Sequence, residues 1–148
     1  MAGISTHVLD NLTGWPGVGM RIDFSLFDDG RWKLLKTLAT NADGRTDQPV
    51  LAASEARVGQ YELAFHIGDY YATEKVAPEE LFVDRGMPVR FALFDAKQHY
   101  HVPMLCTPWQ LICATKTTCA VPSTHRSPRS MRVTCRTARP SYRRKGTC

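Results

Sequence analysis

The stretch Met20-Arg21-Ile22-Asp23-Phe24-Ser25-Leu26 decides the fold class of this chain. Its apolar side chains alternate with polar ones, which is the period of a β-strand that buries one face. The sequence Asp28-Asp29-Gly30 follows closely, and Asp and Gly tolerate the left-handed backbone angles of a tight turn. The stretch therefore predicts a half-buried strand that ends in a turn.

The same alternation recurs along the chain and indicates an all-β fold. Further strands are predicted at residues 4–8, 32–40, 61–67, 89–93 and 100–106, and a second turn lies at residues 41–44. One short helix is predicted at residues 77–82, where Pro78 and two glutamates suit a first helical turn. Several short strands, frequent turns and a single short helix are typical of a β-sandwich.

The charges divide the chain into two unlike parts. The 148 residues carry a net charge of +5, but residues 1–105 sum to −4 and residues 106–148 to +9. After residue 113 little apolar sequence remains to offset chain entropy. We therefore expect a folded domain over residues 1–109 and a disordered, basic tail over residues 110–148. The length suits one domain, and no apolar run is long enough for a membrane span.

The cysteines also gather in the C-terminal part. All five follow Leu105, and their spacings contain no C-x-x-C pair, so a zinc knuckle is not favoured. We expect no signal peptide, and with the odd cysteine count this argues against a secreted disulfide framework. We therefore expect a cytoplasmic protein, or a peroxisomal one if the source is eukaryotic. The basic tail has no interleaved aromatic residues apart from Tyr142, so we expect no nucleic-acid partner.

Four basic side chains are candidates for chemistry: His7, Arg45, His99 and His101. The alternation of the strand places the side chain of His7 on one face and those of Thr6 and Val8 on the other. His99 and His101 are two residues apart and therefore share one face of their strand. A neutral imidazole can take a proton from water, and a guanidinium can bind carbonyl or enolate oxygens. The alternatives are a structural or solvated strand histidine and a merely exposed arginine. Two strand histidines could also ligate zinc, but no further ligand is evident, and we expect no metal. Ser5 and Thr6 lack the surroundings of a nucleophile elbow.

Five motifs occur in a characteristic order. They are Ser5-Thr6-His7-Val8-Leu9-Asp10, Thr40-Asn41-Ala42-Asp43-Gly44-Arg45-Thr46, Gly59-Gln60-Tyr61-Glu62-Leu63, Gly68-Asp69-Tyr70-Tyr71 and His99-Tyr100-His101-Val102-Pro103. Together they resemble the 5-hydroxyisourate hydrolases of the transthyretin-like family, over about residues 4–109. The resemblance implies a transthyretin-like β-sandwich of two antiparallel sheets, a homotetramer, and ring-opening hydrolysis of 5-hydroxyisourate in urate catabolism without a cofactor.

The resemblance also assigns roles to individual residues. His7 and His101 match the catalytic histidines, and Arg45 matches a substrate-binding arginine that acts with His7. The product implied is 2-oxo-4-hydroxy-4-carboxy-5-ureidoimidazoline. The alternative is a non-catalytic, transthyretin-like protein that binds a small ligand.

The C-terminus departs from the family pattern after Pro108-Trp109. The family ends on a strand closing in Tyr-Arg-Gly-Ser, and that tetrapeptide is absent at the expected position. We therefore expect the last strand to be missing or altered and the activity to be impaired. The abrupt loss favours a change of reading frame over gradual divergence, with a genuine extension as the alternative.

Overall fold

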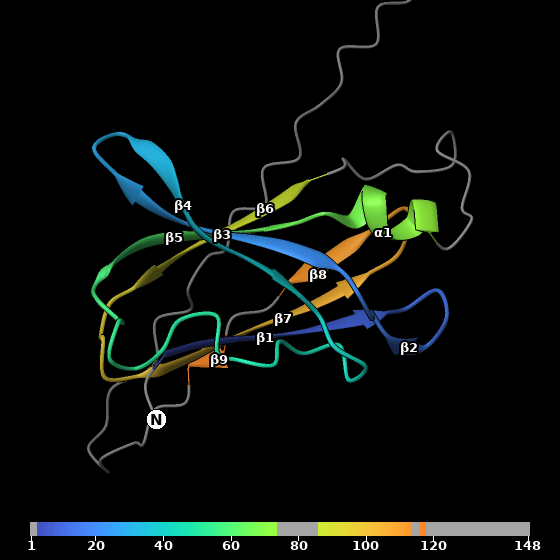
Figure 1. Ribbon diagram of the computed structural model, residues 1–148, viewed down its shortest axis with the longest axis horizontal. Helices are drawn as coiled ribbons and strands as arrows, with labels where there is room; N and C mark the ends of the chain where they lie inside the picture. The colour runs from blue at the N-terminus through green and yellow to red at the C-terminus, as the bar shows by residue number, and fades with distance from the viewer. Residues whose placement is uncertain (1–2, 74–85, 114–115, 118–148) are drawn as a thin grey trace, which may run out of the picture.

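Two β-sheets face each other around one apolar core in the computed structural model, which describes residues 3–73, 86–113 and 116–117 (Figure 1). The first sheet, called the β3 sheet, is antiparallel, and its order is β4 (Arg31–Ala39), β3 (Arg21–Asp28), β5 (Gly59–Phe65), β6 (Met87–Leu93). The second, called the β1 sheet, has the order β2 (Trp15–Pro16), β1 (Gly3–Asp10), β7 (His99–Cys106), β8 (Leu111–Cys113), and β9 (Lys116–Thr117) also pairs with β7. The predicted β-sandwich is confirmed.

Strand β3 shows why the alternation decides the fold. Ile22 and Phe24 are fully buried, whereas Asp23 between them lies on the outer face. The Phe24 ring stacks on Tyr61 of β5 with 5.4 Å between ring centroids, so β3 anchors the core. The predicted turn after β3 is also present, since Asp29 and Gly30 have φ angles of 49° and 76°. Both residues of this hairpin loop therefore adopt the left-handed backbone that Asp and Gly tolerate.

The described residues include one helix, α1, at a position where the sequence predicts no helix. Helix α1 spans Ile67–Thr73, and the strand predicted to reach residue 67 ends at Phe65. The buried face of this helix has the i, i+3, i+4 spacing, at Ile67, Tyr70 and Tyr71. The sequence did not predict it, because Ile67 also continues the strand alternation that precedes it. The helix predicted at residues 77–82 lies outside the described residues.

The expectation of two antiparallel sheets needs one correction. Strands β1 and β7 run parallel, with Ser5 opposite His101 and His7 opposite Pro103. Parallel neighbours need a crossover connection rather than a hairpin, and here the whole β3 sheet lies between β1 and β7 in the chain. Their pairing is therefore a long-range contact.

The last strand is altered rather than missing. Two short strands pair antiparallel with β7: β8 places Leu111 opposite Cys106, and β9 places Lys116 opposite His101. Leu111 and Cys113 also pack against the core. The first residues after 109 thus contribute to the β1 sheet, whereas the disorder expected for the tail beyond residue 117 lies outside the described residues.

A buried carboxylate joins α1 to the ends of β1 and β7. Asp10 is 1% exposed, and its Oδ1 accepts a hydrogen bond of 2.7 Å from the Tyr71 hydroxyl. Its Oδ2 accepts bonds from the Tyr70 and Thr13 hydroxyls, at 3.3 and 3.1 Å. Burial, followed by the bond to Asp10, raises the pKa of Tyr71 far above its ordinary value, so the hydroxyl remains a donor. Burial likewise raises the pKa of the neighbouring Cys106 thiol to about 11.

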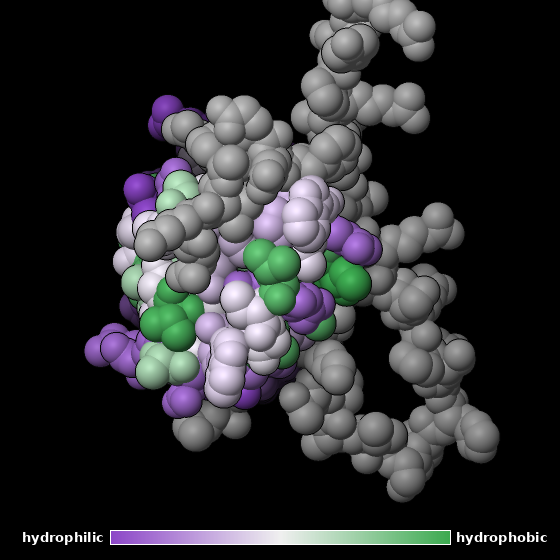
Figure 2. All heavy atoms as spheres, turned by 90° about the vertical axis from the view of Figure 1, so that its right-hand side faces the viewer, coloured by the Kyte–Doolittle hydropathy of each residue, from purple (hydrophilic) through white to green (hydrophobic). Residues whose placement is uncertain are grey.

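The surface beside α1 shows no continuous apolar patch among the residues that are coloured in Figure 2. Green, hydrophobic residues are scattered among purple and white ones on this face. No helix among the described residues is long and apolar enough to span a membrane.

Candidate active site

Strand β1 presents His7 away from the core. Thr6 and Val8 are 1% and 0% exposed, whereas Ser5 and His7 are half-buried on the opposite face. This confirms the orientation that the alternation predicts for His7. Ser5 and His7 lie two residues apart and therefore share the outer face of the β1 sheet.

A glycine turn brings Arg45 against β1. His7 and Arg45 form an isolated antiparallel bridge, and the N–H of Val8 donates to the carbonyl of Gly44 at 2.8 Å. Gly44 has a φ of 69°, and a Cβ there would collide with the Val8 carbonyl oxygen. Residues directly opposite in a bridge point to the same face, so Arg45 lies beside His7. Only a glycine at position 44 allows this close approach.

Strand β7 brings two further histidines to the same face. Tyr100 and Val102 are buried, whereas His99 and His101 are half-buried on the outer face. The parallel register puts His101 opposite Ser5, two positions along β1 from His7. His7, Arg45, His99 and His101 are therefore brought together on one side of the β1 sheet.

The surroundings of His7 favour its neutral form. Burial is the largest cause that lowers the pKa of His7, and the positive charge of Arg45 lowers it further. The backbone and the charge of Asp43 oppose this shift without reversing it. The lowered pKa of His7 therefore favours the uncharged imidazole at pH 7, the state in which it can accept a proton.

Removing the Arg45 charge should raise the pKa of His7. We expect NMR titration of the His7 ring to show its proton uptake at a higher pH in Arg45→Gln than in the unchanged chain. The rise should be partial, because burial, the larger cause, persists. An unchanged or lower titration midpoint in Arg45→Gln would contradict the pairing of these two side chains.

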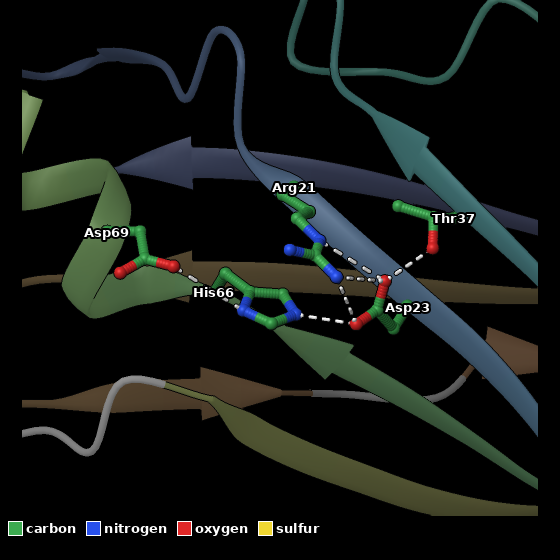
Figure 3. Close-up of polar contacts among 5 residues, drawn as sticks. All are labelled: Arg21, Asp23, Thr37, His66 and Asp69. Carbon is green, nitrogen blue, oxygen red and sulfur yellow. Dashed lines mark hydrogen bonds and ion pairs between the residues drawn. The ribbon is translucent and has the colours of Figure 1, made fainter. Parts of the chain in front are cut away.

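A second polar cluster lies on the β3 sheet and does not include the predicted site residues (Figure 3). His66, 19% exposed, contacts Asp23 through Nε2 at 2.8 Å and Asp69 of α1 through Nδ1 at 3.6 Å. Asp23 also accepts a hydrogen bond of 2.7 Å from Thr37 and pairs with Arg21 at 3.1 Å. Hydrogen bonds from Thr37, His66 and Arg21 outweigh the opposing effect of burial and lower the pKa of Asp23. This cluster ties β3, β4 and α1 together.

Ser5 is the residue of the site that sequence reasoning missed. The sequence argued only against its use as a nucleophile, whereas its Oγ lies 2.9 Å from His99 Nε2 and 2.9 Å from His101 Nδ1. Its place on the face of His7 was visible in the alternation. Its two partners on β7 were not, because they lie more than 90 residues away. The part of the chain that the structure describes contains no group of three or more side chains suited to hold a metal ion.

The chain is similar to proteins of known name and structure over most of its length. The chain is 43% identical over 110 residues to 5-hydroxyisourate hydrolase from Pseudomonas aeruginosa, covering 74% of this chain and 86% of that protein. It is 46% identical over 107 residues to 5-hydroxyisourate hydrolase from Mesorhizobium japonicum, covering 72% and 85%. The crystal structure of transthyretin from Sparus aurata superposes with a TM-score of 0.72 at 18% identity, covering 80% of this chain and all of that one.

The family assignment rests on most of the domain rather than on one motif. The description HIUase/Transthyretin family matches residues 4–112, which include β1, the Gly44 turn, β7 and most of β8. The match ends at residue 112, within β8, a few residues beyond Pro108-Trp109, after which the sequence predicts the departure from the family pattern. With its sandwich fold and its relatives, this chain belongs to the HIUase/Transthyretin family.

Proposed function

We propose that this chain hydrolyses 5-hydroxyisourate, opening its ring to give 2-oxo-4-hydroxy-4-carboxy-5-ureidoimidazoline. The observation that carries the proposal is the gathering of His7, Arg45 and His101 on one face of the β1 sheet. The names of the relatives, which are 5-hydroxyisourate hydrolases at 43% and 46% identity, support it.

The reaction needs a base for water and a cation for the oxygen that becomes negative. A neutral His7 or His101 takes a proton from water as the water oxygen attacks a ring carbonyl. Arg45 stays charged and binds the developing oxyanion through its planar fork. The ring C–N bond then breaks, and the proton passes from the imidazole to the leaving nitrogen. Side chains of this chain can perform each step without an organic cofactor.

A non-catalytic binding protein is the weaker alternative. Two imidazoles and a guanidinium on one face suit an anionic, carbonyl-rich ligand rather than an apolar one. The lowered pKa of His7 favours an imidazole that can accept a proton, which hydrolysis requires and ligand binding alone does not.

The proposal also includes two expectations: lower activity because of the altered C-terminus, and assembly into a homotetramer. Strands β8 and β9 pair with β7, at the position that the resemblance gives to the family's last strand. They lack the Tyr-Arg-Gly-Ser sequence in which that strand ends. We expect turnover below that of a chain that carries the tetrapeptide. A homotetramer and a cytoplasmic location remain predictions.

The direct test follows the ultraviolet absorbance of freshly generated 5-hydroxyisourate with the purified full-length chain. The decay should be faster than the spontaneous reaction, in proportion to protein concentration. A folded protein that leaves the spontaneous rate unchanged, while a small ligand still binds to it, would favour the binding protein.

A further inference from the structure

The hydroxyl of Ser5 lies between two imidazoles. Its Oγ is 2.9 Å from Nε2 of His99 and 2.9 Å from Nδ1 of His101. Both distances are those of good hydrogen bonds. All three side chains are half-buried on the outer face of the β1 sheet, next to His7. The position comes from the parallel register, which sets Ser5 opposite His101 and Gly3 opposite His99.

A serine hydroxyl carries one proton and two lone pairs, so it can donate to only one of these rings. When His101 donates from Nδ1 to Ser5, the Ser5 proton can point to Nε2 of His99, and Nε2 of His101 is an acceptor. When the direction is reversed, His99 donates to Ser5, Ser5 donates to Nδ1 of His101, and Nε2 of His101 carries the proton. The two directions make His101 a base in one case and an acid in the other.

We propose that Ser5 couples His99 to His101 in a hydrogen-bonded relay that switches His101 between base and acid. In this relay Ser5 and His99 are positioning residues, because they act through His101 rather than on the substrate. The inference rests on the hydrolysis proposed above and deepens it by assigning the return of the proton.

The proton balance closes over one cycle. Nε2 of His101 takes a proton from water, its Nδ1 proton passes to Ser5 Oγ, and the Ser5 proton passes to Nε2 of His99. The cation then resides on His99, and His101 is a neutral acid with its proton on Nε2. When the ring C–N bond breaks, His101 gives that proton to the leaving nitrogen. The other two protons return along the same path and restore the first state.

Cutting the relay at Ser5 should lower kcat more than it changes KM, because in this proposal Arg45 and the two catalytic histidines contact the substrate and Ser5 acts only through His101. We expect Ser5→Ala to lower kcat roughly tenfold or more, since efficient proton transfer contributes about 10²–10⁴-fold. Ser5→Thr keeps the hydroxyl and suits a strand, so it should restore most of kcat. His99→Gln cuts the other end and should resemble Ser5→Ala. Ser54→Ala removes an exposed loop serine and serves as the matched control.

An NMR measurement separates failure of the relay from failure of the proposed hydrolysis. The ¹⁵N shifts of the imidazoles report which nitrogen carries the proton in the full-length chain without substrate. We expect His99 and His101 each to hold one dominant tautomer, and Ser5→Ala to convert both to tautomer mixtures. Unchanged ring-nitrogen shifts in Ser5→Ala overturn the relay even if the chain hydrolyses 5-hydroxyisourate. Changed shifts in a chain without hydrolysis support the relay and overturn the function. A Ser5→Ala or His99→Gln variant with the kcat of the unchanged chain also overturns the relay.

Discussion

Replacing His101 by asparagine is expected to lower kcat for 5-hydroxyisourate hydrolysis by about 10²–10⁴-fold, because the change removes a positioned general base. His7→Asn should lower it in the same range, and Arg45→Gln should lower it through the lost oxyanion contact. The sandwich should remain folded, since all three side chains lie on the outer face of the β1 sheet and not in the core. Absorbance assays on folded variants measure the loss.

His66→Asn provides the control for this set. His66 is also a half-buried histidine with polar partners, but it lies on the other sheet in the cluster with Asp23 (Figure 3). Its replacement should affect stability at that cluster and leave kcat within a small factor of the unchanged chain. Equal losses of kcat for His66→Asn and His101→Asn would refute the assignment of the site.

The second large effect is on stability. Asp10→Ala should lower the free energy of unfolding by about 3–5 kcal/mol, because it leaves the buried Tyr70 and Tyr71 hydroxyls without this acceptor. Each buried donor that loses its partner costs about 1–3 kcal/mol, and bonds to charged groups are the stronger ones. Urea unfolding followed by circular dichroism measures the change.

Tyr71→Phe is the matched variant for Asp10→Ala. It removes one donor from the same network but leaves the carboxylate with its other partners, Tyr70, Thr13 and the Leu12 N–H. We expect a smaller loss, on the order of 1–2 kcal/mol. If Asp10→Ala costs no more than Tyr71→Phe, Asp10 does not join α1 to the β1 sheet as the geometry indicates.

Local patterns in the sequence account for most of the fold. Alternation located β1, β3, β5, β6 and β7, because a strand with one buried face shows its period within a few residues. The turn at Asp29-Gly30 could also be predicted from the local sequence, because its backbone angles depend on which residues occupy those two positions. Helix α1 was not predicted, because its first buried residue, Ile67, continues the alternating pattern of the preceding strand. The helical spacing becomes visible only with the next buried residues, Tyr70 and Tyr71.

The sequence by itself determined which face of its strand His7 occupies and that His99 and His101 share a face, because side-chain direction follows the strand period. The strand alternation did not place Arg45 in the same site as these histidines; the resemblance to a family implied it. Only the tertiary structure decided that β1 and β7 pair in parallel and that Ser5 meets both histidines of β7. Strand register depends on contacts between residues more than 90 positions apart, and no local pattern records such a contact.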